Sequence, residues 1–583
     1  AQWMGLLFIL YGVSGLFPRI WRSLPEGIRE RVRRQGPFAF LTLLTGAVYH
    51  SLLMGNMPWI ADHSVHQGKA WVLWERLLTT GRLSGWTSIA GAGYPAETLY
   101  PPLADLYIVA VRALTLGLLS WEATYAIAFL GFLVLYVWVF YFVGRKIGGP
   151  WAGLFAGLFA LMDVGAFRQG GWTFTVRWGV WPLTLSIGLT FWALSFLDTA
   201  LTKRRGMRRA IVLAALAILA HPMALLLLVP ASLMLVWFHY AKGQSLWRVF
   251  WRGALWLVAS CALAAWWLGP FFSFGPQYSA HVSALSGTAN NVAGGLWGLS
   301  LWANAWPWAA ALGVLGAVFL VHRARTPLAS ALVVVSAGAL ILSSTSFLAG
   351  LGLFDLFPTF RHIQFPRFLL FVKGTAFLCA GWMLVDLGRI TGRGYRRKWA
   401  VRLVVLVILS ALTLPLIQHL VEHRLLPLTR YPVRPELADG LQDIGAQVRK
   451  LARGHKTPVR VALDGGFHEH RHAAFPIFSG VGVVKLGYVP SDTYKYRARD
   501  RVSEVPSRPE DLALLNVAWI VSIGPSRIAR TRLIRKSHGV YLYEFLDYSP
   551  RQVHLPTGKV RRSSFSDERI RVELDQMPPE GGA

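Results

Sequence analysis

Residues 101–119, PPLADLYIVAVRALTLGLL, decide how the chain passes through a membrane. The stretch is apolar and nearly as long as a membrane-spanning helix, which needs ~20 residues. It also carries Asp105 and Arg112, seven residues apart and therefore on one helix face, where contact with lipid would be costly. Counting it as a span would move the basic pair Arg145–Lys146 to the outer side. We therefore predict a helix that lies at, or dips into, the outer membrane interface.

The composition of the whole chain indicates a membrane protein. Of its 583 residues, 54% are hydrophobic and 15% are charged, whereas a soluble domain carries about 25% charged residues. The formal net charge of +30 would suggest a nucleic-acid partner in a soluble protein. Here the basic residues lie in short islands between apolar blocks, as the positive-inside rule predicts, and no nucleic-acid-binding module accompanies them. The islands are residues 19–34, 145–146, 203–209, 242–252, 322–325 and 389–398.

Placing every basic island in the cytoplasm gives a consistent topology of about 11 or 12 spans. The predicted spans are residues 37–54, 123–143, 150–163, 178–197, 209–221, 223–239, 252–270, 298–320, 327–345, 367–386 and 399–417, with an additional N-terminal run at 3–17. The segments on the opposite side are 55–122, 164–177, 271–297, 346–366 and 418–583. We predict an α-helical polytopic membrane domain over 1–417, in which 55–122 forms a first outer loop with interfacial helices, and an extracytoplasmic α+β domain over 418–583.

The region 418–583 differs from the rest in its mixed charge and short β-like runs. Strands are predicted at residues 459–463, 481–486, 518–523 and 540–545. His468, His470 and His472 alternate in the sequence FHEHRH and would share one face of a strand, a spacing compatible with zinc. No fourth ligand accompanies them in the sequence, so a solvated loop is the preferred interpretation and no metal site is predicted.

Asp62 comes just after the first long span and is followed by His63 and His66. A carboxylate at the mouth of a helical bundle can act as a general base or bind a divalent cation. Alternatively, Asp62 only caps the helix that follows, as Asp often does. The stretch 66–80 has apolar residues near helical spacing, which is typical of an interfacial helix. Asp62, His63 and His66 are the catalytic candidates.

A second outer segment, DVGAFRQGGWTFTVRWGVWP at 163–182, contains Asp163, Arg168 and Arg177. Its Gly170–Gly171 pair permits a tight turn. Arginine at the mouth of two helices can hold a phosphate through two parallel hydrogen bonds, or it can extend along the interface with its charge in water. Both interpretations stay open for these residues.

A third segment, FPTFRHIQFPRFLLFVKG at 357–374, places Arg361, His362 and Arg367 before a span and Lys373 inside it. A charge inside a span indicates a functional site. A lipid-borne phosphate entering from the outer leaflet is a natural partner for Arg367 and Lys373. The alternative is an internal salt bridge of Lys373, with Asp105 as a candidate partner.

Two outer features favour structural roles or leave the role open. His221-Pro222 marks a turn between two apolar runs, where a hydrogen-bonded turn histidine is preferred to a catalytic one. The segment 271–297 is rich in Gly, Ser and Asn, a composition that suits a mobile lid and an inert exposed loop equally.

The order of these parts resembles the GT-C superfamily of membrane glycosyltransferases: an acidic residue after the first span, interfacial helices, the sequence YPPL at 100–103, and a span ending in a basic pair. Short motifs resemble two bacterial groups within it. Those similar to the membrane family labelled 6-pyruvoyl-tetrahydropterin-synthase-related are DHSVH (62–66), GYPAETLYPPL (93–103), GGWTFTVRWGVWP (170–182), AHP (220–222) and RHIQFPRFL (361–369). Those similar to the YfhO-like family are LLNVAWIVS (514–522) and GVYLYEF (539–545).

The resemblance implies an enzyme that transfers a sugar from a polyprenyl-phosphate carrier to a glycan, lipid or protein acceptor on the outer face of a bacterial inner membrane. It implies that Asp62 is the general base, with inversion at the anomeric carbon, and that Arg367, together with Arg177, holds the carrier phosphate. Metal-dependent members carry a paired acidic motif, whereas His63 follows Asp62 here. A metal-independent mechanism is therefore favoured, with a divalent cation left open and Asp163 as the candidate second ligand. The substrate-binding candidates are Tyr100, Asp163, Arg168, Arg177, Arg361, His362, Arg367 and Lys373.

Two other classes of function stay open. A GT-C-like scaffold that has lost catalysis would serve as a subunit of a membrane assembly, and the single acidic residue of the DHSVH motif keeps this alternative in place. A transporter of lipid-linked substrates would show inverted repeats with broken helices in matching halves, and the sequence shows no such repeat. An Asp62→Asn variant separates the enzyme from the scaffold.

Overall fold

The computed structural model describes most of the chain. The described residues are 23, 25–59, 61–87, 89, 94–98, 100–163, 165, 170–203, 205–274, 278–280, 307–324, 326–357, 363–393, 435–455, 459–464, 474–485, 494–496, 512–513, 516–526, 528–548, 560–565 and 570–574. The predicted spans at 3–17 and 399–417, the boundary predicted near residue 418 and the FHEHRH histidines lie outside them.

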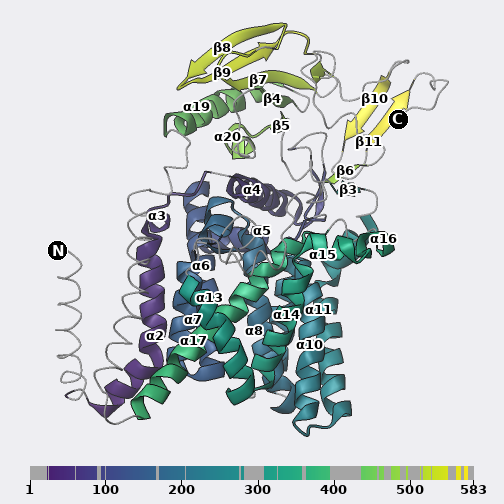
Figure 1. Cartoon of the computed structure of the whole chain (residues 1–583). Helices are drawn as coiled ribbons and strands as arrows, with labels where there is room; N and C mark the ends of the chain where they lie inside the picture. The colour runs from purple at the N-terminus through teal and green to yellow at the C-terminus, as the bar shows by residue number, and fades with distance from the viewer. Residues whose placement is uncertain are drawn as a thin grey trace.

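A bundle of apolar helices forms the main body of the protein (Figure 1). Its helices are α2 (Glu26–Val48), α6 (Trp121–Gly148), α7 (Pro150–Met162), α8 (Trp181–Lys203), α9 (Met207–Ala220), α10 (Met223–Ala241), α11 (Leu246–Phe274), α13 (Pro307–Phe319), α14 (Pro327–Leu342) and α17 (Leu369–Arg393). Within the described residues, 5 helices are long and apolar enough to cross a membrane: Trp121–Gly148, Trp181–Lys203, Met223–Ala241, Leu246–Ser273 and Phe365–Leu387. The polytopic helical membrane fold is therefore confirmed.

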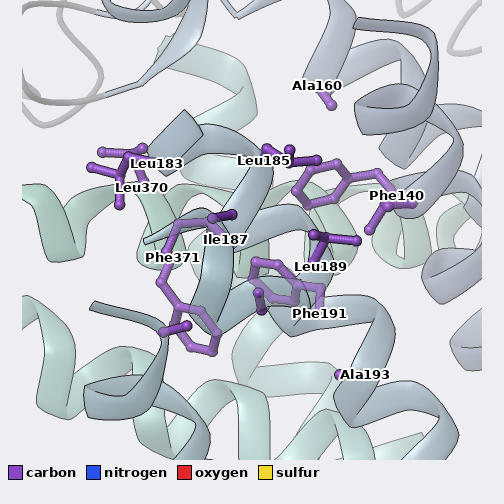
Figure 2. Packing of buried hydrophobic residues seen from close by; sticks show 14 of the residues in the cluster. Phe140, Ala160, Leu183, Leu185, Ile187, Leu189, Phe191, Ala193, Leu370 and Phe371 are labelled. Carbon is purple, nitrogen blue, oxygen red and sulfur yellow. The ribbon is translucent and has the colours of Figure 1, made fainter. Parts of the chain in front are cut away.

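Aromatic and branched side chains of α8 and α17 fill the centre of the bundle, as Figure 2 shows. The rings of Phe191 and Phe371 stack with their centroids 4.6 Å apart, and Phe140 of α6 packs against Phe191 at 5.5 Å. Gly374 permits this approach, because a Cβ at that position would lie 2.5 Å from the Phe191 ring. Three helices therefore meet in close contact at these rings.

Residues 101–119 form α5 (Leu103–Leu114), whose 12 residues reach about 18 Å and cannot cross ~30 Å of hydrocarbon. The helix packs against α4 (Asp62–Thr80), and Figure 1 shows both at the end of the bundle nearest the C-terminal strands. Asp105 is fully buried inside the protein, while Arg112 stacks over Trp121 with its guanidinium carbon 4.9 Å from the ring centroid. The charged groups of Asp105 and Arg112 therefore both have protein neighbours and need not contact lipid.

Short elements complete this end of the bundle. They are α3 (His50–Leu53), the hairpin β1 (Gly85–Thr87) and β2 (Tyr94–Ala96), the π-helical turn η1 (Thr173–Arg177), α15 (Thr345–Gly350), α16 (Leu353–Leu356) and the 3-10 turn η6 (Phe365–Phe368). A second π-helical turn, η4 (Leu320–Ala324), ends α13.

The C-terminal region contains a five-stranded mixed sheet in the order β5-β4-β7-β9-β8. Its strands are β4 (Arg460–Asp464), β5 (Gly482–Lys485), β7 (Val517–Ile523), β8 (Thr531–Ser537) and β9 (Val540–Phe545). Strand β4 pairs in parallel with β5 and β7, and β9 pairs antiparallel with β7 and β8. The helices α19 (Pro435–Ala452) and α20 (Phe475–Ser479) pack on it, and β10 (Val560–Phe565) pairs with β11 (Ile570–Leu574) as a separate hairpin. The four predicted strands are present, and β8 is an additional one.

The C-terminal sheet region rests on the first loop, near the start of α4. The ring of Phe478 in α20 packs against Trp59, with centroids 5.9 Å apart. The backbone N–H of Val483 donates to the carbonyl of Ile89 at 2.8 Å. Strand β6 (Tyr494–Tyr496) pairs with β3 (Tyr278–Ala280), which belongs to the predicted loop 271–297. These segments therefore meet at one end of the bundle.

Candidate functional site at the end of the bundle

Asp62 begins α4 and is held by a segment more than one hundred residues away in sequence. Its backbone N–H donates to the carbonyl of Trp178 at 3.2 Å. Ala61, just before it, has a left-handed backbone with φ 48°, which is strained for a residue with a Cβ. Gly179 has φ 72°, and a Cβ there would lie 2.7 Å from the backbone nitrogen of His63. Only glycine fits this close approach.

His63 is locked in one tautomer by two hydrogen bonds. Its Nε2 lies 2.6 Å from the carbonyl of Val176, which can only accept, so Nε2 carries the proton. Its Nδ1 therefore accepts from the Tyr125 hydroxyl at 2.7 Å, and that hydroxyl accepts from Trp181 Nε1 at 2.9 Å. Burial lowers the pKa of His63 to about 4, against the opposing effect of the Val176 carbonyl. The ring is thus a neutral connector between α4, α6 and the segment before α8.

The charge of Arg367 acts on the carboxyl group of Asp62. The Asp62 side chain is partly exposed. Burial raises the pKa of Asp62 to about 7, and the positive charge of Arg367 opposes this rise. Arg367 lies in η6, with its guanidinium carbon 5.9 Å from the ring centroid of Phe174 in η1. A carboxylate that exchanges protons near neutral pH beside a cation can act as a base and tolerate a bound anion.

Arg177 belongs to the backbone segment that holds Asp62 and His63. It ends η1, between Val176 and Trp178, whose carbonyls bond the His63 ring and the Asp62 amide. Its side chain is partly exposed. The structure therefore brings the backbone of Arg177 to the same site as Asp62 and Arg367.

A buried ionic cluster fills the space between α4 and α5. Lys69 donates to Asp105, and both side chains are almost completely buried. Lys69 also lies over the Tyr100 ring, 4.2 Å from its centroid, and the His66 ring centroid lies 6.0 Å from the same ring. His66 Nδ1 is 4.0 Å from Asp105. His66 and Tyr100 thus lie at the edge of this cluster. Asp105 pairs with Lys69, so the ion pair between Asp105 and Lys373 that was considered from the sequence is not formed.

Glu97 belongs to this cluster and was not among the predicted site residues. It is 4% exposed and has a left-handed backbone with φ 58°. Burial raises the pKa of Glu97 to about 8; Lys69 opposes the rise and the Asp105 carboxylate reinforces it. The protonated carboxyl can then donate to Asp105. The signal in the sequence that could have indicated Glu97 as a site residue is its position in the GYPAETLYPPL motif.

Lys373 forms an ion pair with Asp163, with Nζ 2.6 Å from Oδ1 and both side chains buried. Asp163 follows α7, where the backbone turns sharply through Gly170 and Gly171, with φ 77° and 71°. A Cβ on Gly171 would lie 2.5 Å from the Asp163 carbonyl oxygen, so the predicted tight turn is present and needs glycine. Lys373 therefore forms an internal ion pair, as one of the two interpretations of the sequence predicted, but its partner is Asp163 and not Asp105.

The remaining predicted residues, Arg168, Arg361 and His362, lie outside the described residues. Tyr125 and Trp181, which form the hydrogen-bonded chain to His63, were not predicted as site residues. Each lies among other apolar and aromatic residues of a helix, and the hydrogen-bond partner of each depends on how the helices pack.

The opposite end of the bundle carries a different polar group. Lys146 pairs with Asp198 at 2.8 Å, and His239 lies 3.0 Å from the same carboxylate. The first turn of α6 contains Glu122, which accepts from Gln442 of α19 at 3.4 Å, so the last turn with Lys146 lies at the end away from the C-terminal region. The group of Lys146, Asp198 and His239 and the Asp62 site therefore lie at opposite ends of α6.

No family model matches the chain, and no curated protein matches it. Solved structures do match. The archaeal oligosaccharyltransferase AglB from Archaeoglobus fulgidus, in complex with an inhibitory peptide and a dolichol-phosphate, gives a TM-score of 0.52 at 11% identity over 85% of this chain and 69% of that chain. ArnT from Cupriavidus metallidurans bound to undecaprenyl phosphate gives 0.51 at 15% identity over 89% and 100%. The arabinofuranosyltransferase AftD from Mycobacteria gives 0.57 at 14% identity over 89% of this chain and 42% of that chain.

These similarities concern architecture, since the identities are low. The narrower likeness to the two bacterial groups stays a prediction. The protein has the fold of the GT-C membrane glycosyltransferases.

Proposed function

We propose that the protein transfers a sugar from a polyprenyl-phosphate carrier to a hydroxyl acceptor, with Asp62 as the general base. The observation that carries this proposal is that Asp62 and Arg367 both lie against the short segment 174–178: the Asp62 amide donates to the Trp178 carbonyl, and the Arg367 guanidinium carbon lies 5.9 Å from the Phe174 ring centroid. A carboxyl whose pKa is about 7 can take a proton at neutral pH, and a cation beside it can hold an anionic leaving group.

The proposed step is a single displacement. Asp62 takes the proton of the acceptor hydroxyl while the oxygen of that hydroxyl forms a bond to the anomeric carbon of the sugar. The bond between that carbon and the phosphate oxygen breaks, and the electron pair leaves with the polyprenyl phosphate. Arg367 stabilises the charge that develops on this phosphate, with Arg177 as a second candidate. Attack opposite the leaving group inverts the anomeric carbon.

The choice of donor is supported by chemistry and by the fold. A phosphate on a lipid can reach a guanidinium at the membrane surface without leaving the bilayer. Two structures with the same fold hold such lipids, a dolichol-phosphate in AglB and undecaprenyl phosphate in ArnT. The sugar and the acceptor class (glycan, lipid or protein) are not distinguished by the described side chains.

The orientation in the membrane is part of this proposal. Lys146 and the other basic islands suit the cytoplasmic side, because positive residues flanking spans are retained there. The Asp62 site and the C-terminal region, at the other end of α6, would then face the outside of a bacterial inner membrane.

The described carboxylates do not suit a divalent cation. Asp62 faces the positive charge of Arg367, and Asp163, the candidate second ligand, is bonded to the Lys373 ammonium. A structure of AglB holds zinc and sulfate, so a cation occurs on this fold. We include no metal in the proposed step, and transfer should survive a chelator.

The test is release of polyprenyl phosphate by the full-length protein in liposomes, from a panel of polyprenyl-phosphate-linked hexoses and pentoses. Asp62→Asn keeps the size and removes the base, and it should lower release by about 100-fold or more. A Glu75→Gln variant, with an exposed carboxylate on the same helix, is the matched control and should be unchanged. Equal, measurable release by Asp62→Asn and the wild type would refute Asp62 as the base, whereas no release by the wild type from any donor would favour the scaffold alternative.

A further inference from the structure

One face of α4 carries a row of polar side chains that leads from the candidate base into the protein. Asp62, His66 and Lys69 follow each other at intervals of four and three residues, and such residues lie on one side of a helix with neighbouring Cβ atoms about 5–6 Å apart. Asp62 is partly exposed, whereas His66 is 2% and Lys69 3% exposed. On this face, His66 is therefore the first buried side chain behind the base.

The ring of His66 is enclosed, yet neither of its nitrogens has a hydrogen-bond partner among the described residues. Oδ1 of Asp105 lies 4.0 Å from Nδ1, which is too far for a hydrogen bond, and this oxygen is also buried without a partner. The carbonyl of Gly179 is near enough to act on the ring, but not in hydrogen-bonding geometry. Both ring nitrogens therefore keep their full capacity to bind another group.

The surroundings of this ring combine aromatic surfaces with further unpartnered oxygen atoms. The ring of Trp181 meets that of His66 edge-on with centroids 5.8 Å apart, and the ring of Tyr100 lies at 6.0 Å. Glu97 Oε2, in the same cluster, is buried and has no partner among the described residues. Carboxylate oxygens, an imidazole and aromatic rings together suit a sugar, which has hydroxyl groups around an apolar ring.

The protonation state of His66 narrows the chemistry of its partner. Burial holds the pKa of His66 well below its ordinary value, and the positive charge of Lys69 adds to this effect. The ring is therefore neutral, with one nitrogen that donates and one that accepts. An ion would use only one of the two nitrogens, whereas hydroxyl groups both donate and accept. Buried polar groups without a partner are costly, and in native proteins they commonly meet water or a ligand.

We propose that His66 is a specificity-determining residue that binds a hydroxyl group of the sugar on the polyprenyl carrier. This inference rests on the proposed function in one respect, namely that a carrier-linked sugar is the donor. The anomeric carbon of that sugar must come within bonding distance of the hydroxyl that Asp62 deprotonates. The rest of the sugar ring then lies close enough to reach a side chain one helical turn from Asp62.

Two variants of His66 separate a ligand contact from a structural role. His66→Leu removes both nitrogens at similar volume, and because these atoms have no protein partner, the stability of the free protein should be kept or raised. His66→Gln keeps one group that donates and one that accepts. Both are made in the full-length protein, and the melting temperature of each is measured in detergent without ligand.

Gln67→Met is the matched control. Gln67 is 0% exposed, and both polar atoms of its amide are buried without a partner among the described residues, as in His66. It lies about 100° further around α4, away from the row that contains Asp62. This variant should keep the stability of the free protein and change neither the binding of a donor nor the release of polyprenyl phosphate.

Binding is measured with the panel of polyprenyl-phosphate-linked hexoses and pentoses and with bare polyprenyl monophosphate. We expect His66→Leu to weaken binding of the preferred sugar-linked carrier by about tenfold and to leave the bare carrier within about twofold of the wild type. His66→Gln should stay within about threefold for both carriers. Among donors that each lack one hydroxyl of the preferred sugar, one should bind equally well to the wild type and to His66→Leu.

Three outcomes would overturn the proposal. A lower melting temperature of His66→Leu with unchanged donor binding would show that the ring is held by internal water. Equal weakening of both carriers would show a general disturbance of the site. Slower release with unchanged donor binding would assign the hydroxyl to the acceptor instead of the donor.

Binding is independent of transfer, so this proposal and the proposed function can fail separately. A wild type that prefers the sugar-linked carrier through His66 but releases no polyprenyl phosphate would refute the transfer and keep the sugar site. A wild type that binds the bare and the sugar-linked carriers equally would refute the sugar site, whatever the outcome for Asp62→Asn.

Discussion

The backbone N–H of Asp62 donates to the carbonyl oxygen of Trp178 at 3.2 Å, so the candidate base is positioned by a loop that precedes α8. The ring of the next residue, His63, bonds the carbonyl of Val176, two residues before Trp178, at 2.6 Å. These two bonds join the start of an interfacial helix to the mouth of the bundle. The position of the carboxylate is therefore a property of the packing between the two segments and not of α4 alone.

Gly179→Ala should disrupt this junction. The new Cβ would lie 2.7 Å from the backbone nitrogen of His63 and 3.1 Å from the carbonyl carbon of Asp62, so one segment must move. A displacement of about 1 Å at a catalytic group can cost about 100-fold in rate. We expect release of polyprenyl phosphate to fall by about that factor while the protein still inserts and folds.

Gly81→Ala is the matched control for that variant. Gly81 ends α4 with φ 70°, almost the same as the 72° of Gly179, but a Cβ there would meet nothing within 4 Å. Both variants carry the backbone strain of about 1–2 kcal/mol, and only Gly179→Ala adds the contact with the site. Equal rates in the two variants would show that the contact with Asp62 and His63 is unimportant.

The rate should depend on pH through Asp62. Because the base must be ionised, kcat/KM should rise with pH up to about 7 and then level off. Burial raises the pKa of Asp62 and the charge of Arg367 lowers it, so removing that charge should raise the pKa further. In Arg367→Gln the residual activity should therefore level off at a higher pH than in the wild type.

Arg367→Lys separates charge from geometry in the same experiment. It keeps the positive charge but not the planar fork, so the midpoint of the pH profile should stay near the wild-type value while the rate falls. The assignment of Asp62 as the base would be refuted by a midpoint that is the same in all three proteins, measured with one donor.

The sequence predicted most of the helices and strands but not which buried charged side chains pair with each other. Apolar blocks located the helices, and β-branched runs located four strands, because burial on one or both faces leaves such patterns. Strand β8 was missed because TRLIRKS is largely exposed and has no apolar alternation. Asp62 and Arg367 stood out as charges beside spans. The partners in Lys69–Asp105 and Lys373–Asp163, 36 and 210 residues apart, depend on how helices pack and leave no local pattern.

Tyr125→Phe tests the connection that holds His63. Loss of the hydroxyl leaves the Trp181 Nε1–H and the His63 Nδ1 without the partners at 2.9 and 2.7 Å. Each unsatisfied buried group costs about 1–3 kcal/mol, so the melting temperature should fall clearly. Tyr136→Phe is the control on the same helix, since no hydrogen bond of its hydroxyl occurs among the described residues, and its effect should stay within about 0.5 kcal/mol. Comparable losses in both variants would contradict the proposed role of the Tyr125 hydroxyl.

The Lys373–Asp163 pair decides between an internal ion pair and a second phosphate ligand. Lys373→Met leaves the Asp163 carboxylate buried without its cation, which should cost about 3–5 kcal/mol of unfolding free energy. Adding Asp163→Asn removes that charge and retains an acceptor for the neighbouring Gly165 amide, so the double variant should recover most of the loss. If the role is internal, the double variant binds polyprenyl monophosphate like the wild type, because Arg367 is untouched. Restored stability with binding about tenfold weaker would instead show that Lys373 contacts the carrier phosphate.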